Sequence, residues 1–307
     1  MSKFFEKKYD WVEFLQHACV PNINFICISS CEMRAESTMY IEDMQNKGGC
    51  SVFSIDYHYD RDAISFQSKE YTLKQDLYQF VDMFDKSIPL LLNITAMDIR
   101  LLGALLYNIK KLGFSKVYCM YAEPLKYRKR ANQDDCEGVD RFDLYKRFRG
   151  IQPIPGYLRA NDDNLEEKWV ALLGFDGKRA EQISDRYDFS DIVPVITLPS
   201  FQSGWHNYAL QENLDLIRSN GRKPEYIVAN SFLSAYEYLQ KLKDAHPNSY
   251  LRVTPLGTKV NALGVLLFSL NQHEGIEILY DNPIEEGEPT IDRGNTYVFD
   301  ISDVINF

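Results

Sequence analysis

Short apolar runs recur along the chain at intervals that suit strands alternating with helices. Runs such as FICIS, PLLLNI, WVALLGF and EYIVAN lack the apolar/polar alternation of a strand with one solvated face. Continuous apolar strands suit a parallel sheet covered by helices on both faces. We expect strands at 23–29, 51–56, 89–94, 116–121, 168–173, 192–198, 225–229, 250–254 and 276–280.

Longer segments between these runs have the spacing of amphipathic helices. They predict helices near 34–46, 73–86, 98–112, 178–187, 206–219, 231–243 and 260–271. The N-terminal YDWVEFLQHAC adds an outer amphipathic helix, and the tail from residue 296 adds an edge strand. This order predicts right-handed βαβ units, and therefore an α/β protein with two Rossmann-like, doubly wound parallel sheets.

The two halves of the sequence resemble each other. NFICISSCEMRAESTM and KWVALLGFDGKRAEQI each pass from an apolar strand through a small polar turn to Arg-Ala-Glu. LLNITAMDIRLLGALLYNI and VTPLGTKVNALGVLLFSL also correspond, and KVYCMYAEP and IEILYDNP follow in the same order. The correspondence predicts a diverged internal duplication. Half one spans 1–150, with the N-terminal helix and a charged connector, and half two spans 151–307.

Composition narrows the functional classes. A net charge of −10 argues against broad binding of nucleic acid. No apolar run reaches the roughly 18 residues of a membrane span, and the start lacks a secretory signal, so we expect a cytoplasmic protein. Six cysteines without a CxxC pair indicate free thiols. In the segment 126–149, basic residues alternate with aromatic ones, so the segment could bind a partner. Acidic residues are interleaved with them, however, and favour a solvated face.

Two turns in the second half are candidates for phosphate binding. Ligands of open α/β sheets bind beyond the carboxyl ends of the strands, where helix N-termini present backbone N–H groups. Gly257, Thr258 and Lys259 add a hydroxyl and a cation at one such place. The alternative is that Gly257 relieves backbone strain, Thr258 caps the helix and Lys259 is solvated. Neither GxxxxGK[ST] nor GxGxxG occurs in the chain.

The second turn follows the strand at 168–173. Gly174, Asp176, Gly177 and Arg179 could hold a phosphate through backbone N–H groups and the guanidinium, while Asp176 contacts a hydroxyl or a metal. An Asp-Gly turn with solvated charges is the alternative. The first half offers Arg34, Thr95, Asp98 and Arg100 at equivalent strand ends.

The loop PSFQSGWHNY supplies further candidates. Trp205 could stack on a base or ring, and His206 could hydrogen-bond that ring or have a catalytic role; a loop anchored by its tryptophan is the alternative. No two histidines have metal-ligand spacing, so we expect no metal and no cofactor.

LNITAMDIRLLGALL and VTPLGTKVNALGVLL resemble the CRISPR-associated Rossmann-fold (CARF-like) sensor domains. Gly257, Thr258 and Lys259 match the family's Gly-Thr-Lys turn; in the first half Asn93 and Thr95 match, whereas Ala96, Met97 and Asp98 replace the glycines. The resemblance implies binding of an oligonucleotide second messenger and a sensor role in a bacterial defence or signalling system. Because the chain lacks the effector domain that such sensors commonly carry, it also implies either a separate effector protein or an activity inside the cleft.

We therefore expect a phosphorylated or nucleotide-like ligand in a cleft between the two Rossmann-like halves. Two alternatives remain open. One is a hydrolase or transferase acting on a nucleotide or sugar phosphate, with Asp176 or His206 as general base. The other is a scaffold or partner-binding subunit with a vestigial cleft.

Overall fold

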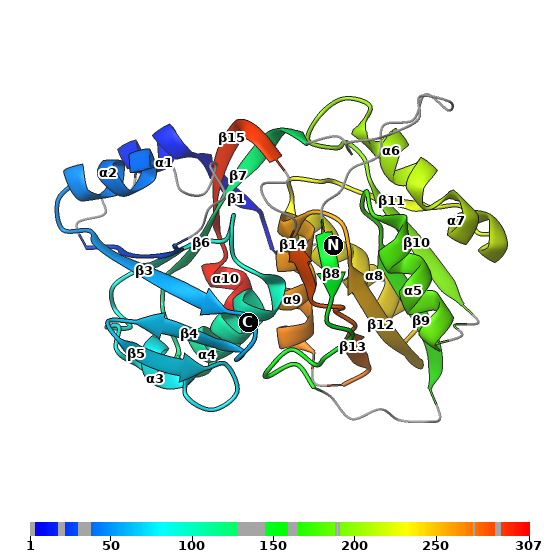
Figure 1. Cartoon of the computed structure of the whole chain (residues 1–307), viewed down its shortest axis with the longest axis horizontal. Coiled ribbons are helices and arrows are strands. Elements are labelled where there is room, and N and C mark those ends of the chain that lie inside the picture. Colours follow the sequence, from blue (N-terminus) through cyan, green and yellow to red (C-terminus); the bar gives the residue numbers. More distant parts are fainter. Residues whose placement is uncertain are drawn as a thin grey trace. The chain divides into compact units, whose positions relative to one another are not determined.

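The chain folds into two compact units (Figure 1). The computed structural model describes residues 4–17, 22–29, 38–127, 145–158, 165–187, 189, 191–272, 274–285 and 290–307. Unit 1 comprises Met1–Lys126 and Ile291–Phe307, and unit 2 comprises Tyr127–Thr290. This division differs from the boundary expected after residue 150. The C-terminal segment belongs to unit 1 because strand β15 (Thr290–Asp300) pairs with β1 (Lys7–Asp10).

Unit 1 contains an eight-stranded sheet in the order β1-β15-β7-β6-β2-β3-β4-β5. Its parallel core is formed by the four predicted strands, observed as β2 (Asn24–Ile28), β3 (Ser51–His58), β6 (Leu90–Asn93) and β7 (Val117–Tyr127). β4 (Ala63–Phe66) and β5 (Lys69–Thr72) extend one edge as an antiparallel hairpin that the sequence did not predict. The tail strand β15 is not at the edge, because β1 covers it.

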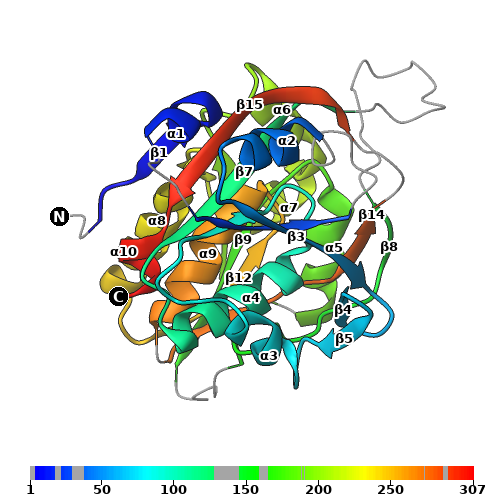
Figure 2. The ribbon, with the colours of Figure 1, turned by 90° about the vertical axis from the view of Figure 1, so that its left-hand side faces the viewer.

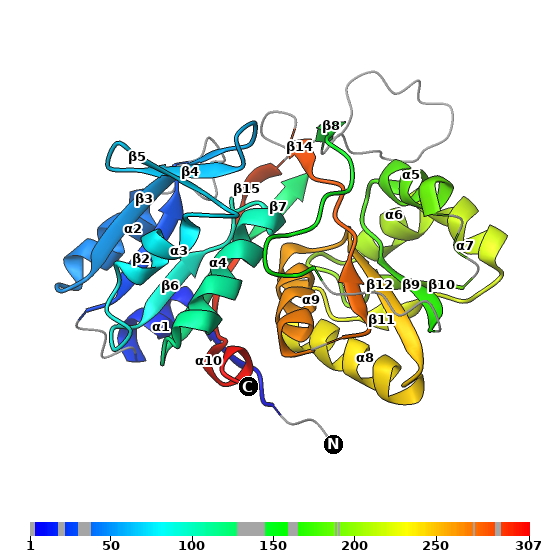
Figure 3. The ribbon, with the colours of Figure 1, turned by 90° about the horizontal axis from the view of Figure 1, so that it is seen from below.

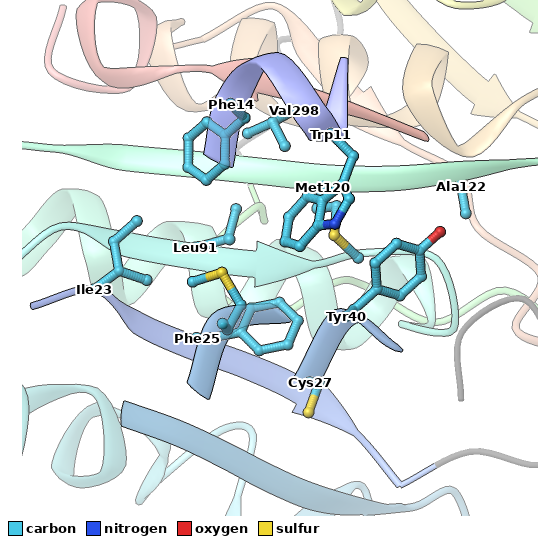
Figure 4. Close-up of a cluster of buried hydrophobic side chains, with 11 residues drawn as sticks. Trp11, Phe14, Ile23, Phe25, Cys27, Tyr40, Leu91, Met120, Ala122 and Val298 are labelled. Carbon is cyan, nitrogen blue, oxygen red and sulfur yellow. The ribbon is translucent and has the colours of Figure 1, made fainter. Parts of the chain in front are cut away.

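Helices cover both faces of this sheet. α1 (Trp11–His17) and α2 (Thr38–Asn46) lie on one face, and α3 (Leu77–Asp82) and α4 (Ile99–Leu112) on the other (Figure 2). The short helix α10 (Ser302–Ile305) follows β15. Figure 4 shows how α1 and α2 close over the strands: their apolar side chains meet those of β2, β6, β7 and β15. The cluster includes Trp11, Phe14, Phe25, Cys27, Tyr40, Leu91, Met120, Ala122 and Val298.

Unit 2 contains a five-stranded, fully parallel sheet in the order β11-β10-β9-β12-β13. All five predicted strands are confirmed as β9 (Glu166–Leu172), β10 (Ile192–Thr197), β11 (Glu225–Ile227), β12 (Ser249–Pro255) and β13 (Ile276–Ile278). The order is that of a doubly wound Rossmann-type sheet. A separate antiparallel pair, β8 (Tyr145–Phe148) with β14 (Pro283–Glu285), completes the unit.

The unit 2 helices also lie on both faces of their sheet (Figure 3). α5 (Gly177–Tyr187), α6 (Trp205–Glu212) and α7 (Leu214–Asn220) cover one face, and α8 (Phe232–Ala245) and α9 (Lys259–Asn271) cover the other. The helix predicted at 206–219 is thus two helices joined at Asn213. None of the helices in the described ranges is long and apolar enough to cross a membrane. The mixed α/β class is confirmed.

Candidate functional site

The candidate site of unit 2 lies where its strand order reverses. β10 and β11 continue the sheet on one side of β9, whereas β12 and β13 lie on the other. In doubly wound sheets the connections diverge at such a point, and ligands bind beyond the carboxyl ends of its two strands. Those strands are β9 and β12, and the two predicted turns follow them directly. Leu256 N donates to Leu172 O at 2.9 Å, so the turns lie side by side.

Gly174 allows the two turns to approach closely, and Gly177 allows the start of α5 to approach the end of α6. A Cβ on Gly174 would lie 2.2 Å from Leu256 O, and one on Gly177 would lie 1.8 Å from Glu212 O. Contacts this short exclude any side chain at either position without movement of the backbone. A Cβ on Gly257 would lie 3.4 Å from Leu173 O, and the residue has no positive φ. Gly257 therefore does not relieve backbone strain, contrary to one alternative from the sequence.

Thr258 caps helix α9, as the second part of that alternative predicted. Its Oγ1 accepts from Asn261 N at 3.1 Å, and it lies 2.8 Å from both Ala229 O and Asn261 Oδ1. Its hydroxyl therefore has partners within the protein. Lys259 begins the helix and is half-buried. Since the first N–H groups of a helix have no intrahelical acceptor, this end of α9 favours an anion.

Arg179 is held in a buried ion pair. Its Nε donates to Asp281 Oδ2 at 2.9 Å and its Nη2 to Asp281 Oδ1 at 2.6 Å, with side-chain exposures of 3% and 7%. This two-fold contact links the start of α5 to the segment after β13. Asp281 was missed in the sequence, although its position in YDNP, directly after a predicted strand, was the available signal.

Asp176 lies between the two turn glycines and is half-buried. Burial raises the pKa of its carboxyl group, and the negative charge of Asp281 raises it further, while the Arg179 guanidinium opposes both. Its backbone oxygen accepts from Arg179 N at 3.3 Å. A carboxyl group of raised pKa keeps its proton to a higher pH than a solvated one does.

Aromatic side chains gather beside the β9 turn. The Phe175 ring lies 5.8 Å from Trp205 and 5.2 Å from Tyr127, between ring centroids. Trp205 is the first residue of α6 and is half-buried, and His206 follows it. The tryptophan does anchor its loop, as the alternative from the sequence held, but part of its surface remains exposed.

The candidates in unit 1 are engaged in local structure. Thr95 is fully buried, and its Oγ1 accepts from Ala122 N at 3.0 Å. Asp98 caps α4 by accepting from Arg100 N at 2.7 Å. Arg100 donates from Nε and Nη2 to Asp62 at 2.8 and 2.7 Å. Arg34 and residues 128–144 of the basic segment lie outside the described residues.

The structure thus brings one set of predicted residues together. Gly174 adjoins Leu256 and Gly257 within unit 2, and Asp176, Gly177, Arg179, Thr258 and Lys259 belong to the same two turns and helix starts, whereas Thr95, Asp98 and Arg100 belong to unit 1. Within the described parts of the chain, no three His, Cys, Asp or Glu side chains are grouped to hold a metal ion. No protein-family model matches the chain, and no curated protein matches it either.

Proposed function

We propose that unit 2 binds a phosphorylated or nucleotide-like ligand at the carboxyl ends of β9 and β12. The observation that carries this proposal is the contact between the two glycine turns at the reversal of strand order, where Leu256 N bonds to Leu172 O. Both turns lead into helices, α5 and α9, whose N-termini attract anions. Lys259 and the exposed Lys178 add positive charge at these two helix starts.

Two further expectations from the sequence remain proposals. The duplication is supported by a shared order of four parallel strands, β3-β2-β6-β7 in unit 1 and β10-β9-β12-β13 in unit 2. A sensor role in defence or signalling is supported only by the Gly257-Thr258-Lys259 turn. The binding proposal depends on neither, because its site lies within one unit.

Thermal unfolding with mono-, di- and cyclic nucleotides and with inorganic phosphate tests the proposal. A ligand that binds only the folded state stabilises it by about 2.7 kcal/mol at 100 times its Kd, which raises the melting temperature. Lys259→Ala should weaken binding about 10-fold, because a charge-assisted contact to phosphate is lost. Arg179 is unsuitable for this test, since its replacement would leave the buried Asp281 unpaired.

The matched control is Lys241→Ala, which removes an exposed lysine of α8 in the same unit. It should bind as the wild type does. If no phosphate compound raises the melting temperature, or if the two lysine variants bind equally well, the site is not at this turn.

A second candidate function is hydrolysis or group transfer on the bound nucleotide or sugar phosphate, with Asp176 as the general base or acid. Its position between Gly174 and Gly177 and the raised pKa of its carboxyl group favour this role. Turnover of a stabilising compound, measured by product release, is the test. Asp176→Asn should keep binding and lose turnover; unchanged turnover would remove Asp176 from the mechanism.

A further inference from the structure

The half-buried aromatic cluster of unit 2 lies on the opposite side of the β9 turn from the Gly257-Thr258-Lys259 turn. Phe175 belongs to the β9 turn, and α6, which carries Trp205 and Tyr208, follows the loop after β10. Ring centroids in the cluster are 5.0–6.4 Å apart. Strands of a sheet are about 4.8 Å apart, so the loops after β10 and β12 are centred roughly 10 Å apart across β9.

This cluster contains the least buried of the three tryptophans. Trp11 and Trp169 are 5% and 0% exposed and serve the cores of their units. Trp205 and its three neighbours, Tyr127, Phe175 and Tyr208, are each only partly buried. Aromatic rings left partly exposed beside a ligand site offer flat apolar surface, together with a phenol or indole donor at the ring edge.

A buried amide adds a second, independent indication of a ligand. Asn213, between α6 and α7, is 3% exposed, and its Nδ2 donates to Gly174 O at 2.8 Å and to Ala209 O at 2.7 Å. Its Oδ1 is buried and has no hydrogen-bond partner among the described residues. Buried acceptors are rarely left unpaired, and a sugar hydroxyl is a suitable donor. The amide lies against the β9 turn, between the aromatic cluster and the start of α5.

We propose that the ligand of unit 2 is a nucleoside phosphate whose base packs on the aromatic cluster of Tyr127, Phe175, Trp205 and Tyr208. The phosphate lies at the glycine turns, the sugar crosses the β9 turn near Asn213, and the base lies on the β10 side. This inference rests on the proposed function and adds the class of ligand and its orientation. Phosphates without an aromatic ring should therefore bind more weakly than nucleotides.

The test compares the four ribonucleoside 5′-monophosphates with ribose 5-phosphate by titration calorimetry. The probes share the sugar phosphate and differ in the base. At least one nucleotide should bind about 10-fold or more tightly than ribose 5-phosphate, since stacking of a base on an aromatic side chain contributes that much or more. The same nucleotide should quench the fluorescence of Trp205, the one half-buried tryptophan of the three.

Variants separate the ring contact from the phosphate contact. Trp205→Ala and Tyr208→Ala should each reduce the ratio of the affinity for the nucleotide to that for ribose 5-phosphate several-fold. They should leave the affinity for ribose 5-phosphate itself unchanged. Trp205→Phe keeps a ring, so it should retain most of the advantage and lose the quenching. The two alanine variants remove different rings of the cluster. If one of them does not fold, the other still tests the contact with the base.

Equal affinities for nucleotides and ribose 5-phosphate would overturn this inference and leave phosphate binding intact. An advantage for nucleotides that survives both alanine variants would also overturn it. Failure of every probe to bind would contradict the proposed function itself.

Discussion

The two units share a strand order and differ in how the turns at its reversal are built. In both, the first strand of the parallel series lies between the second and the next strand of that series that pairs with it: β2 lies between β3 and β6, and β9 lies between β10 and β12. Equivalent hydrogen bonds follow the first strands, from Ser29 N to Ile55 O at 2.9 Å and from Leu173 N to Val195 O at 2.8 Å. Between β10 and β12, unit 2 has α6, α7, β11 and α8, whereas between β3 and β6 unit 1 has the hairpin β4–β5 and α3.

The turn after β6 contains two fully buried side chains, whereas Gly257, Thr258 and Lys259 after β12 are half-buried. Thr95 and Met97 are 0% exposed, and the Thr95 hydroxyl accepts from the Ala122 backbone. In unit 2, Gly257 and Lys259 at the corresponding turn are half-buried. The comparison teaches that one strand order can carry turns of different composition and burial, so a ligand site depends on the turn and not on the fold alone.

Each unit also contains an arginine near the start of a helix that bonds twice to one aspartate. Arg100 bonds to Asp62 and Arg179 to Asp281, and both arginine side chains are 3% exposed. The acids differ, because the Asp62 side chain is 26% exposed and that of Asp281 only 7%. Water can therefore replace the carboxylate more easily in unit 1 than in unit 2.

The largest expected effect comes from removing these acids one at a time. Asp281→Ala removes the carboxylate that a buried guanidinium contacts twice and should lower the free energy of unfolding by about 3–5 kcal/mol. Asp62→Ala should lower the free energy of unfolding by less, since water reaches the Asp62 side of the Arg100 pair. Urea denaturation followed by circular dichroism measures both. An equal or larger loss for Asp62→Ala would mean that exposure of the acid does not set the strength of these pairs.

A smaller effect is expected from adding one methyl group to the unit 2 turn. Gly174→Ala places a Cβ 2.2 Å from Leu256 O, so the β9 and β12 turns must separate. Overpacking of this kind costs about 1–3 kcal/mol. Gly257→Ala is the matched control, because its Cβ would meet Leu173 O at 3.4 Å, which needs only a slight adjustment. It should stay within about 0.5 kcal/mol of the wild type. Similar thermal stability of the two variants would contradict the close contact of the turns.

Much of this comparison was predictable from the sequence, because the parallel strands are continuous apolar runs. The nine predicted strands are all present, and the turns at Gly174 and Gly257 lie at strand ends as expected. The added edge strands were missed, since β4 and β5 are short, polar in part and set by pairing with β3. The ion pairs were missed for a related reason: Arg179 and Asp281 are far apart in the sequence, and only the strand order brings them together.

The smallest expected effect is a pH dependence that has opposite signs at two aspartates. Burial raises the pKa of Asp176 in unit 2, whereas a hydrogen bond from Lys7 lowers the pKa of Asp303 in unit 1. A raised carboxyl pKa means that the folded state keeps its proton longer than the unfolded chain, so stability falls as pH rises from the ordinary pKa through the raised one. For Asp303 the stabilisation is present above the ordinary pKa and is lost as pH falls through the lowered one.

Replacing each aspartate by asparagine removes its titration and exposes this difference. Asp176→Asn should be slightly more stable than the wild type at neutral pH and equal to it below the ordinary carboxyl pKa. Asp303→Asn should be slightly less stable at neutral pH and equal to it in acid. Melting temperatures measured from pH 3 to pH 8 compare the two. If Asp176→Asn instead loses stability at neutral pH, the Arg179 guanidinium has a larger effect on the pKa of Asp176 than burial has. The ionised carboxylate then stabilises the fold, and the argument for Asp176 as a proton-transfer group fails.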